Sequence, residues 1–187
     1  MTVVTLHRSL ALTACFMLCV GFLGTGTASA RQWKATPQAL AQEYSLIQDN
    51  RPGNELVIIM WLAPEMVDDP DMRDILSKSL VIGAIDAHIG TDGKFTFAAL
   101  DTIPSKDADG NPLRELKGDD IPPAATGAVH TMDAVFRQAL GPVGAGFHWF
   151  VFDGANVKSC TPGHGFSVLV AGETYTYDTP IPGCPKS

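Results

Sequence analysis

The sequence predicts an α+β domain, or an α/β one, in which three helices pack on a mixed β-sheet of about six strands. Two observations predict this class. Short apolar runs rich in β-branched residues recur along the chain, and segments with helical spacing of apolar residues lie between them. Residues 144–184 then hold three further strand-like runs. The predicted order of elements is α-β-α-β-β-α-β-β-β.

The first 30 residues have the pattern of a signal peptide. Arg8 precedes an apolar run over residues 10–23, and Ala28-Ser29-Ala30 supplies the small residues that a signal peptidase accepts. We therefore expect cleavage after Ala30. The apolar run is too short, and its flanks are wrong, for a helix that spans a bilayer. The alternative is a lipoprotein box ending at Cys15, which would cut the apolar run short. The sequence therefore predicts a periplasmic or secreted protein.

Removing the first 30 of the 187 residues leaves 157, enough for a single domain with a real core, which we place at residues 31–187. Arg8 is the one charged residue of the leader, so the mature charge is 12 minus 20, or −8. Binding to nucleic acid needs clustered basic residues, and anionic membrane surfaces repel an acidic chain. We therefore expect a protein or small-molecule ligand as partner, with no nucleic acid and no membrane span.

Cys160 and Cys184 are the cysteines that remain after cleavage, from four in the whole chain. Disulfides form and persist in exported proteins, and closing a loop of this size contributes about 3 kcal/mol to stability on the chain-entropy account. The alternative is a redox or metal role, but neither cysteine belongs to a Cys-x-x-Cys motif. The sequence favours a structural disulfide.

Each predicted helix begins at a proline. Thr36-Pro37 and Asp69-Pro70 combine a side-chain cap with proline at the first helical position, and Pro122-Pro123 opens the third helix, which Gly141-Pro142 ends. Residues 50–53 end the first helix. The apolar positions are Leu40, Tyr44 and Ile47 in the first helix, Met72, Ile75 and Leu76 in the second, and Val129, Met132, Phe136, Ala139 and Leu140 in the third.

Residues 56–62 form a continuous apolar run, which favours a strand buried on both faces and central in its sheet. Residues 80–89 and 95–100 flank Asp92-Gly93, a strong hairpin signal. The last three strands are expected at residues 147–152, 166–170 and 173–177, as an antiparallel meander. The strand-helix-strand unit that begins at residue 56 can be parallel.

The stretch from Val57 to Leu76, whose strand ends in Trp61-Leu62-Ala63-Pro64, resembles thioredoxin-like domains. Where those domains carry Cys-x-x-Cys, this chain has Glu65-Met66-Val67. The resemblance implies a scaffold that lacks the redox motif and serves as a partner-binding module.

Candidate functional residues are few. Asp86 and His88 lie two apart on one strand and so share a face, and His148 can join them if its strand lies alongside. Such a set can bind zinc or perform acid–base chemistry. Glu65 follows the predicted central strand, at the edge where open α/β sheets bind ligands, and is a further candidate base or ligand. Residues 107–111 do not satisfy the EF-hand pattern, and a plain turn is expected there.

The function that we expect first is that of a non-catalytic binding or accessory protein of the cell envelope. The alternative is a metal-dependent or acid–base enzyme that uses Asp86, His88 and His148, with zinc as the first metal to test. The thioredoxin-like scaffold without a redox motif is a third possibility.

Overall fold

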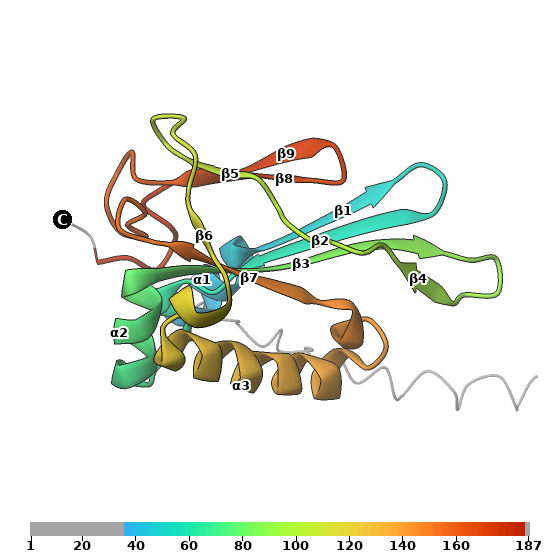
Figure 1. The fold of residues 1–187 in the computed structure, drawn as a ribbon, viewed down its shortest axis with the longest axis horizontal. Helices are drawn as coiled ribbons and strands as arrows, with labels where there is room; N and C mark the ends of the chain where they lie inside the picture. Colours follow the sequence, from blue (N-terminus) through green and yellow to red (C-terminus); the bar gives the residue numbers. More distant parts are fainter. Residues whose placement is uncertain (1–35, 186–187) are drawn as a thin grey trace, which may run out of the picture. The chain divides into compact units, whose positions relative to one another are not determined.

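The computed structural model describes residues 36–185, which contain three α-helices and nine β-strands (Figure 1). The predicted signal peptide, its cleavage site at Ala30 and the alternative box at Cys15 lie outside the described residues. Within residues 36–185, no helix combines the length and the apolar character that crossing a bilayer requires. The described residues belong to one compact unit, Ala35–Ser187, and confirm the predicted α+β class.

Every element of the predicted order is present, and the structure adds three strands that the sequence did not predict. The helices are α1 (Pro37–Ser45), α2 (Pro70–Lys78) and α3 (Pro123–Leu140), with short 3-10 helices η1 (Pro64–Met66), η2 (Gly118–Asp120) and η3 (Gly144–Gly146). The predicted strands are β2 (Glu55–Trp61), β3 (Ser79–Ile89), β4 (Phe95–Phe97), β7 (His148–Asp153), β8 (Phe166–Val170) and β9 (Glu173–Tyr177). The added strands are β1 (Leu46–Arg51), β5 (Ser105–Asp107) and β6 (Glu115–Leu116).

The caps that start α1 and α2 form as predicted. Thr36 Oγ1 accepts a hydrogen bond from the backbone N–H of Ala39 at 3.1 Å, and Asp69 Oδ1 accepts one from Met72 at 2.8 Å. The first helix is shorter than expected, because Leu46 is extended (φ −105°, ψ 118°) and residues 46–51 pair with β2. Ile47, predicted on the apolar face of the helix, therefore lies in β1. The backbone groups of residues 46–51 form hydrogen bonds with β2 in place of those that a longer α1 would have given them.

The main sheet has six strands in the order β1-β2-β3-β7-β6, with β4 also paired to β3. The prediction that β2 is an interior, doubly buried strand is confirmed, since all its residues except Glu55 are buried. The pairing of β2 with β3 is antiparallel, so the parallel strand-helix-strand unit that the sequence allowed is not formed, and α2 connects antiparallel neighbours. The other strand pairs in residues 36–185 are antiparallel as well.

The main sheet is the middle of three layers (Figure 1). One face packs on α2 and α3 through alternate residues of the strands, such as Ile58 of β2 and Val81 of β3. The other face packs on α1 and on a three-stranded sheet of order β5-β8-β9. The three closing strands therefore do not form one meander, because β7 belongs to the main sheet and the β8–β9 hairpin to the small one. Burial on both faces explains the continuous apolar runs of β2 and β3.

The helix α3 covers the sheet with its middle and leaves its end in solvent. Val129, Met132 and Phe136 pack against the core, as predicted. Leu140, which was expected to be buried, is 44% exposed, and Ala139 is exposed as well. Both residues lie in the last turn, just before the chain turns at Gly141.

Polar contacts fix the small sheet to the main one. Tyr175 of β9 donates a hydrogen bond to Asp49 Oδ2 of β1 at 2.7 Å, and Arg51 Nη1 donates to the carbonyl of Ala171 in the β8–β9 turn at 2.9 Å. The hydrogen bond from Tyr175, followed by that from Arg51, lowers the pKa of the Asp49 carboxyl. The buried hydroxyl of Tyr177 lies 3.1 Å from the carbonyl of Ser45 and 3.2 Å from another main-chain carbonyl of the main sheet. These hydrogen bonds therefore connect the small sheet to both β1 and β2 of the main sheet.

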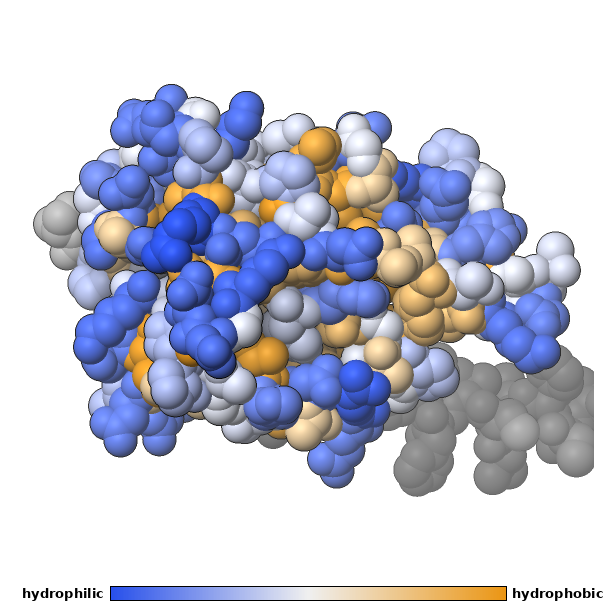
Figure 2. All heavy atoms as spheres, in the orientation of Figure 1, coloured by the Kyte–Doolittle hydropathy of each residue, from blue (hydrophilic) through white to orange (hydrophobic). Residues whose placement is uncertain are grey.

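The molecular surface shows few large apolar side chains. On the face drawn in Figure 2, hydrophilic residues predominate and hydrophobic residues show through between them. The large hydrophobic residues that are exposed in the described part of the chain are Leu46 of β1, Val135 and Leu140 of α3, and Leu169 of β8, which come from three different elements. Scattered apolar residues of this kind are ordinary on a protein surface.

Candidate functional site

The structure places Asp86, His88 and His148 on one face of the main sheet. Asp86 and His88 lie on β3, and His148 pairs in register with Ala84, which shares their face. Ala84 stands four positions before His88, so His148 and His88 are separated along the ladder. Asp86 and His148 are half-buried, whereas His88 is exposed.

These three side chains do not converge on one point. In residues 36–185, one group of three His, Cys, Asp or Glu side chains has ligand atoms that all lie within 4.8 Å of one another, and it is a different group: Glu65, Cys160 and Cys184. Zinc binding by Asp86, His88 and His148 stays a prediction, which zinc titration of the parent protein and of the His88→Ala variant tests.

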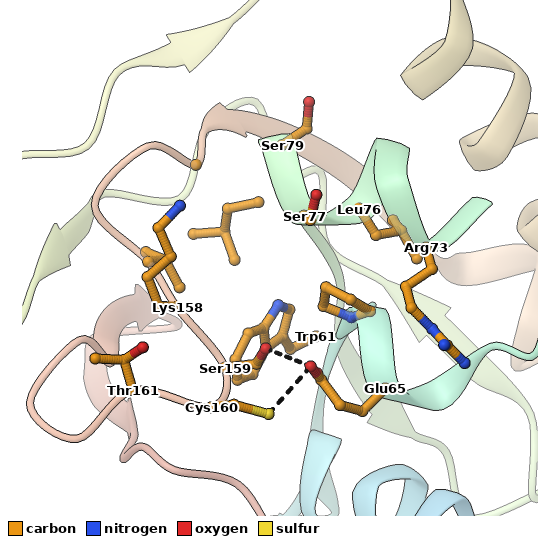
Figure 3. A pocket seen from close by; sticks show the side chains of 14 residues that line it. Trp61, Glu65, Arg73, Leu76, Ser77, Ser79, Lys158, Ser159, Cys160 and Thr161 are labelled. Carbon is orange, nitrogen blue, oxygen red and sulfur yellow. Dashed lines mark hydrogen bonds between the residues drawn. The ribbon is translucent and has the colours of Figure 1, made fainter. Parts of the chain in front are cut away.

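Glu65, the fourth candidate, lies in η1 just after β2, at the edge of a cavity of about 340 Å³. The cavity lies between η1, α2, the start of β3 and the loop that follows β7 (Figure 3). Trp61, Leu76, Leu80 and Val157 give it apolar walls. Its polar lining comes from Glu65, Arg73, Ser77, Ser79, Lys158, Ser159 and Thr161.

The loop after β7 reaches the cavity because it packs closely on β3. Gly154 follows β7, and a Cβ on it would stand 2.7 Å from the backbone nitrogen of Leu80. Any larger residue would push the loop away from the start of β3. This close approach brings Val157, Lys158 and Ser159 over the end of β2.

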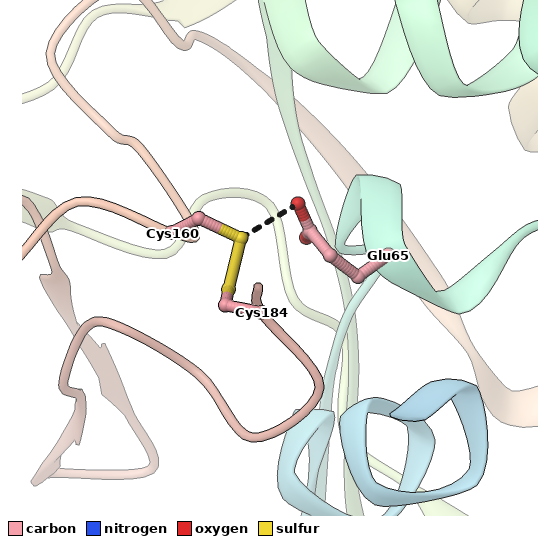
Figure 4. A group of neighbouring side chains, drawn as sticks. All are labelled: Glu65, Cys160 and Cys184. Carbon is pink, nitrogen blue, oxygen red and sulfur yellow. Dashed lines mark hydrogen bonds between the residues drawn. A yellow bond between two sulfur atoms is a disulfide. The ribbon is translucent and has the colours of Figure 1, made fainter. Parts of the chain in front are cut away.

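The carboxylate of Glu65 is held by a serine and lies against a disulfide. Ser159 Oγ donates a hydrogen bond to Glu65 Oε1 at 2.8 Å, and Oε2 is buried without a hydrogen-bond partner among residues 36–185. Sγ of Cys160 lies 3.3 Å from Oε1 (Figures 3 and 4). Because a disulfide sulfur carries no proton, this approach is a close contact and not a donated hydrogen bond.

The predicted disulfide between Cys160 and Cys184 is present, with Cα atoms 5.4 Å apart. It joins the loop after β7 to the end of the described chain and forms part of the cavity wall through Cys160. Export of the protein, on which the prediction rested, concerns residues outside the described range and stays a prediction.

The charges around the cavity do not neutralise one another. Arg73 and Lys158 lie on opposite sides of the view in Figure 3, with Trp61 and Glu65 between them. None of the ion pairs found in residues 36–185 includes Arg73, Lys158 or Glu65. Arg73 Nη2 donates a hydrogen bond to the carbonyl of Val67 at 2.7 Å, which anchors its side chain beside the cavity. The cavity therefore carries two cations and one carboxylate in a protein whose net charge is −7.

The sequence did not indicate Arg73, Lys158 or Ser159 as site residues. Their contribution depends on the fold of the loop after β7 across the end of β2, two segments about a hundred positions apart in the chain. The predicted disulfide placed Lys158 and Ser159 near Cys184, but no local pattern relates any of them to Glu65.

The loop at residues 107–111 is a turn built around Asp107. Asp107 Oδ1 accepts hydrogen bonds from the backbone N–H groups of Asn111 at 2.8 Å and Asp109 at 3.1 Å, and Oδ2 accepts from the side chains of Asn111 and Asn156. Burial raises the pKa of the Asp107 carboxyl, but these hydrogen bonds outweigh burial, so that the net shift is downward.

We expect Asp107→Asn to destabilise the protein at neutral pH and much less in acid. A lowered folded-state pKa means that the carboxylate stabilises the fold above the ordinary Asp pKa of about 3.9 and loses this effect as pH falls through the lower folded value. Melting temperatures of the variant and the parent protein at about pH 7 and about pH 3 check this. Asp119→Asn, at an exposed position, is the control. An equal difference in melting temperature at both pH values would contradict the expectation.

Comparison of the chain with protein-family models, with curated proteins and with solved structures finds no match in any of the three. The inference of function therefore rests on the cavity and on the residues around it.

Proposed function

We propose that the chain is an exported binding or accessory protein of the cell envelope, and that the cavity beside Glu65 holds a small organic anion with an apolar body. The observation that carries the proposal is the cavity of about 340 Å³, in which apolar walls meet two cationic side chains that form no ion pair within residues 36–185. Pockets for small molecules have volumes of roughly 300–1,000 Å³ and combine an apolar lining with a few polar groups. Signal-peptide features of the first 30 residues support export.

The polar groups of the cavity favour an anionic ligand. Ser159 already binds one oxygen of Glu65, whereas the cationic groups of Lys158 and Arg73 have no carboxylate partner in the described residues. An ammonium or guanidinium group forms its strongest hydrogen bonds with an anionic oxygen. The apolar body of the ligand would then contact Trp61 and Leu76, which line the same space.

We expect small carboxylates such as benzoate or hexanoate to raise the melting temperature, and their neutral amides, benzamide and hexanamide, to have no such effect. A ligand that binds only the folded state stabilises that state, and the stabilisation grows with the logarithm of the ligand concentration once this exceeds Kd. Lys158→Ala should weaken carboxylate binding about tenfold or more, the usual effect of losing one hydrogen bond to a charged group. Calorimetry measures the affinity.

Lys106→Ala is the matched control, because Lys106 is an exposed lysine on β5 outside the cavity lining. It should leave the affinity unchanged. Equal stabilisation by the carboxylates and by their amides would contradict an anion site. Loss of affinity in Lys106→Ala to the same extent as in Lys158→Ala would show that the effect is one of net charge.

A further inference from the structure

We propose that reduction of the Cys160–Cys184 disulfide converts Glu65, Cys160 and Cys184 into a zinc site. The ligand atoms of these three side chains all lie within 4.8 Å of one another (Figure 4). This site shares Glu65 and Cys160 with the lining of the cavity proposed above to hold an organic anion, but zinc binding does not depend on binding of that anion. It also differs from the predicted set on β3 and β7, because it requires reduced cysteines.

The distances suit a tetrahedral ion. With Zn–S of about 2.3 Å and Zn–O of about 2.1 Å, a sulfur and an oxygen ligand of one zinc lie roughly 3.6 Å apart. Cys160 Sγ lies 3.3 Å from Glu65 Oε1, so this pair needs little movement. The two sulfurs must separate to roughly 3.8 Å, which side-chain rotation of a cysteine supplies without moving the backbone.

The surroundings already accommodate two thiols. When Cys160 is reduced, its S–H faces Glu65 Oε1, and the S–H of Cys184 faces the carbonyl of Ser159, 3.5 Å from its sulfur. Glu65 Oε2 has no hydrogen-bond partner in the described residues, which leaves a buried lone pair available. A carboxylate and two thiolates brought together in this way need a cation, and zinc accepts both ligand types.

The redox step balances as a thiol–disulfide exchange with a dithiol reductant. One thiolate of the reductant attacks the sulfur of Cys160, an exposed residue, and the bond to Cys184 breaks with Cys184 as leaving thiolate. The second thiolate of the reductant displaces Cys160 and closes the disulfide of the reductant, so that two electrons, and the two thiol protons that the reductant gives up, pass to Cys160 and Cys184. Zinc then binds both cysteines as thiolates, with release of their two protons, together with the Glu65 carboxylate. A fourth position on the metal is open to water from the cavity.

Zinc titration of the full chain, oxidised and after reduction with a phosphine that carries no thiol, tests the proposal. We expect one zinc ion to bind the reduced protein and raise its melting temperature, and no such binding in the oxidised protein. Cobalt(II) in place of zinc should give thiolate-to-metal charge-transfer absorption in the reduced form only. Glu65→Gln, which keeps the shape of the side chain and both cysteines, should weaken zinc binding at least about tenfold.

His88→Ala is the control, because it removes a ligand of the predicted Asp86, His88 and His148 set and leaves this one intact. It should bind zinc as tightly as the parent protein. Binding that is equal in the oxidised and reduced proteins, or that is lost in His88→Ala, would overturn the proposal and favour the set on β3 and β7. Binding to the reduced chain without a rise in melting temperature would also overturn it, because it would place the metal on unfolded cysteines.

Discussion

Trp61→Ala is expected to lower the free energy of unfolding by about 3–5 kcal/mol, the usual cost of truncating a large aromatic side chain in a core. Trp61 closes β2, is 2% exposed, and makes edge-to-face contacts with Phe166 and Tyr177 at ring-centroid distances of 5.1 and 5.7 Å. These contacts join the main sheet to the small one. The truncation therefore removes these contacts and leaves an empty volume between the sheets, next to the cavity that Trp61 already lines.

Urea unfolding followed by far-ultraviolet circular dichroism measures the effect. Leu169→Ala is the control, because Leu169 lies on β8 in the same small sheet and is 39% exposed. The unfolding free energy of Leu169→Ala should differ from that of the parent protein by no more than about 0.5 kcal/mol, as is usual for surface positions. A midpoint for Trp61→Ala that lies close to that of the parent protein would show that the contact between the sheets contributes little to stability.

The second large effect is expected from the double variant Cys160→Ala/Cys184→Ala, which should lose about 3 kcal/mol of unfolding free energy. The two cysteines are 24 positions apart, so the disulfide restricts a loop of moderate length in the unfolded chain. In a domain of this size the loss corresponds to a fall of roughly 6–12 °C in melting temperature.

The double variant should still fold, because other contacts hold the end of the described chain. Ile181 is buried, its N–H donates to the carbonyl of Ser159 at 2.9 Å, and a Cβ on Gly183 would stand 2.3 Å from the carbonyl of Pro37 in α1. Adding a reductant to the parent protein should reproduce the loss, and adding it to the variant should change nothing. A parent protein whose unreduced mass shows two free thiols would contradict the disulfide itself.

Features that depend on neighbouring residues could be predicted from the sequence. The caps at Thr36 and Asp69, the hairpin turn near Gly93 and the alternation of faces along β3 are all confirmed, because each is decided within a few residues. The disulfide was predictable from the signal-peptide pattern of the first 30 residues together with the two cysteines that remain after cleavage. Glu65 was identified as a candidate by its place after the apolar strand, and the structure places it at the edge of the cavity.

Features that depend on distant pairing could not be predicted. The residues of β1 have helical spacing up to Ile47, and only their partners in β2 make them a strand. The short strands β5 and β6 have no strong pattern of their own and exist because β8 and β7 offer open edges to pair with. Pairing of this kind is set by backbone hydrogen bonds between remote segments, which leave little signal in a single sequence.

The sequence by itself determined the class of the fold, most of its elements, the disulfide and the acidic character of the chain. The tertiary structure alone decided that β7 and β8 part into different sheets, that Asp86, His88 and His148 stay separate, and that Glu65 meets Ser159 and both cysteines. The physical reason lies in the loop after β7. Its close packing at Gly154 against β3 directs Lys158, Ser159 and Cys160 over the end of β2, and that packing is a contact between segments that no local pattern encodes.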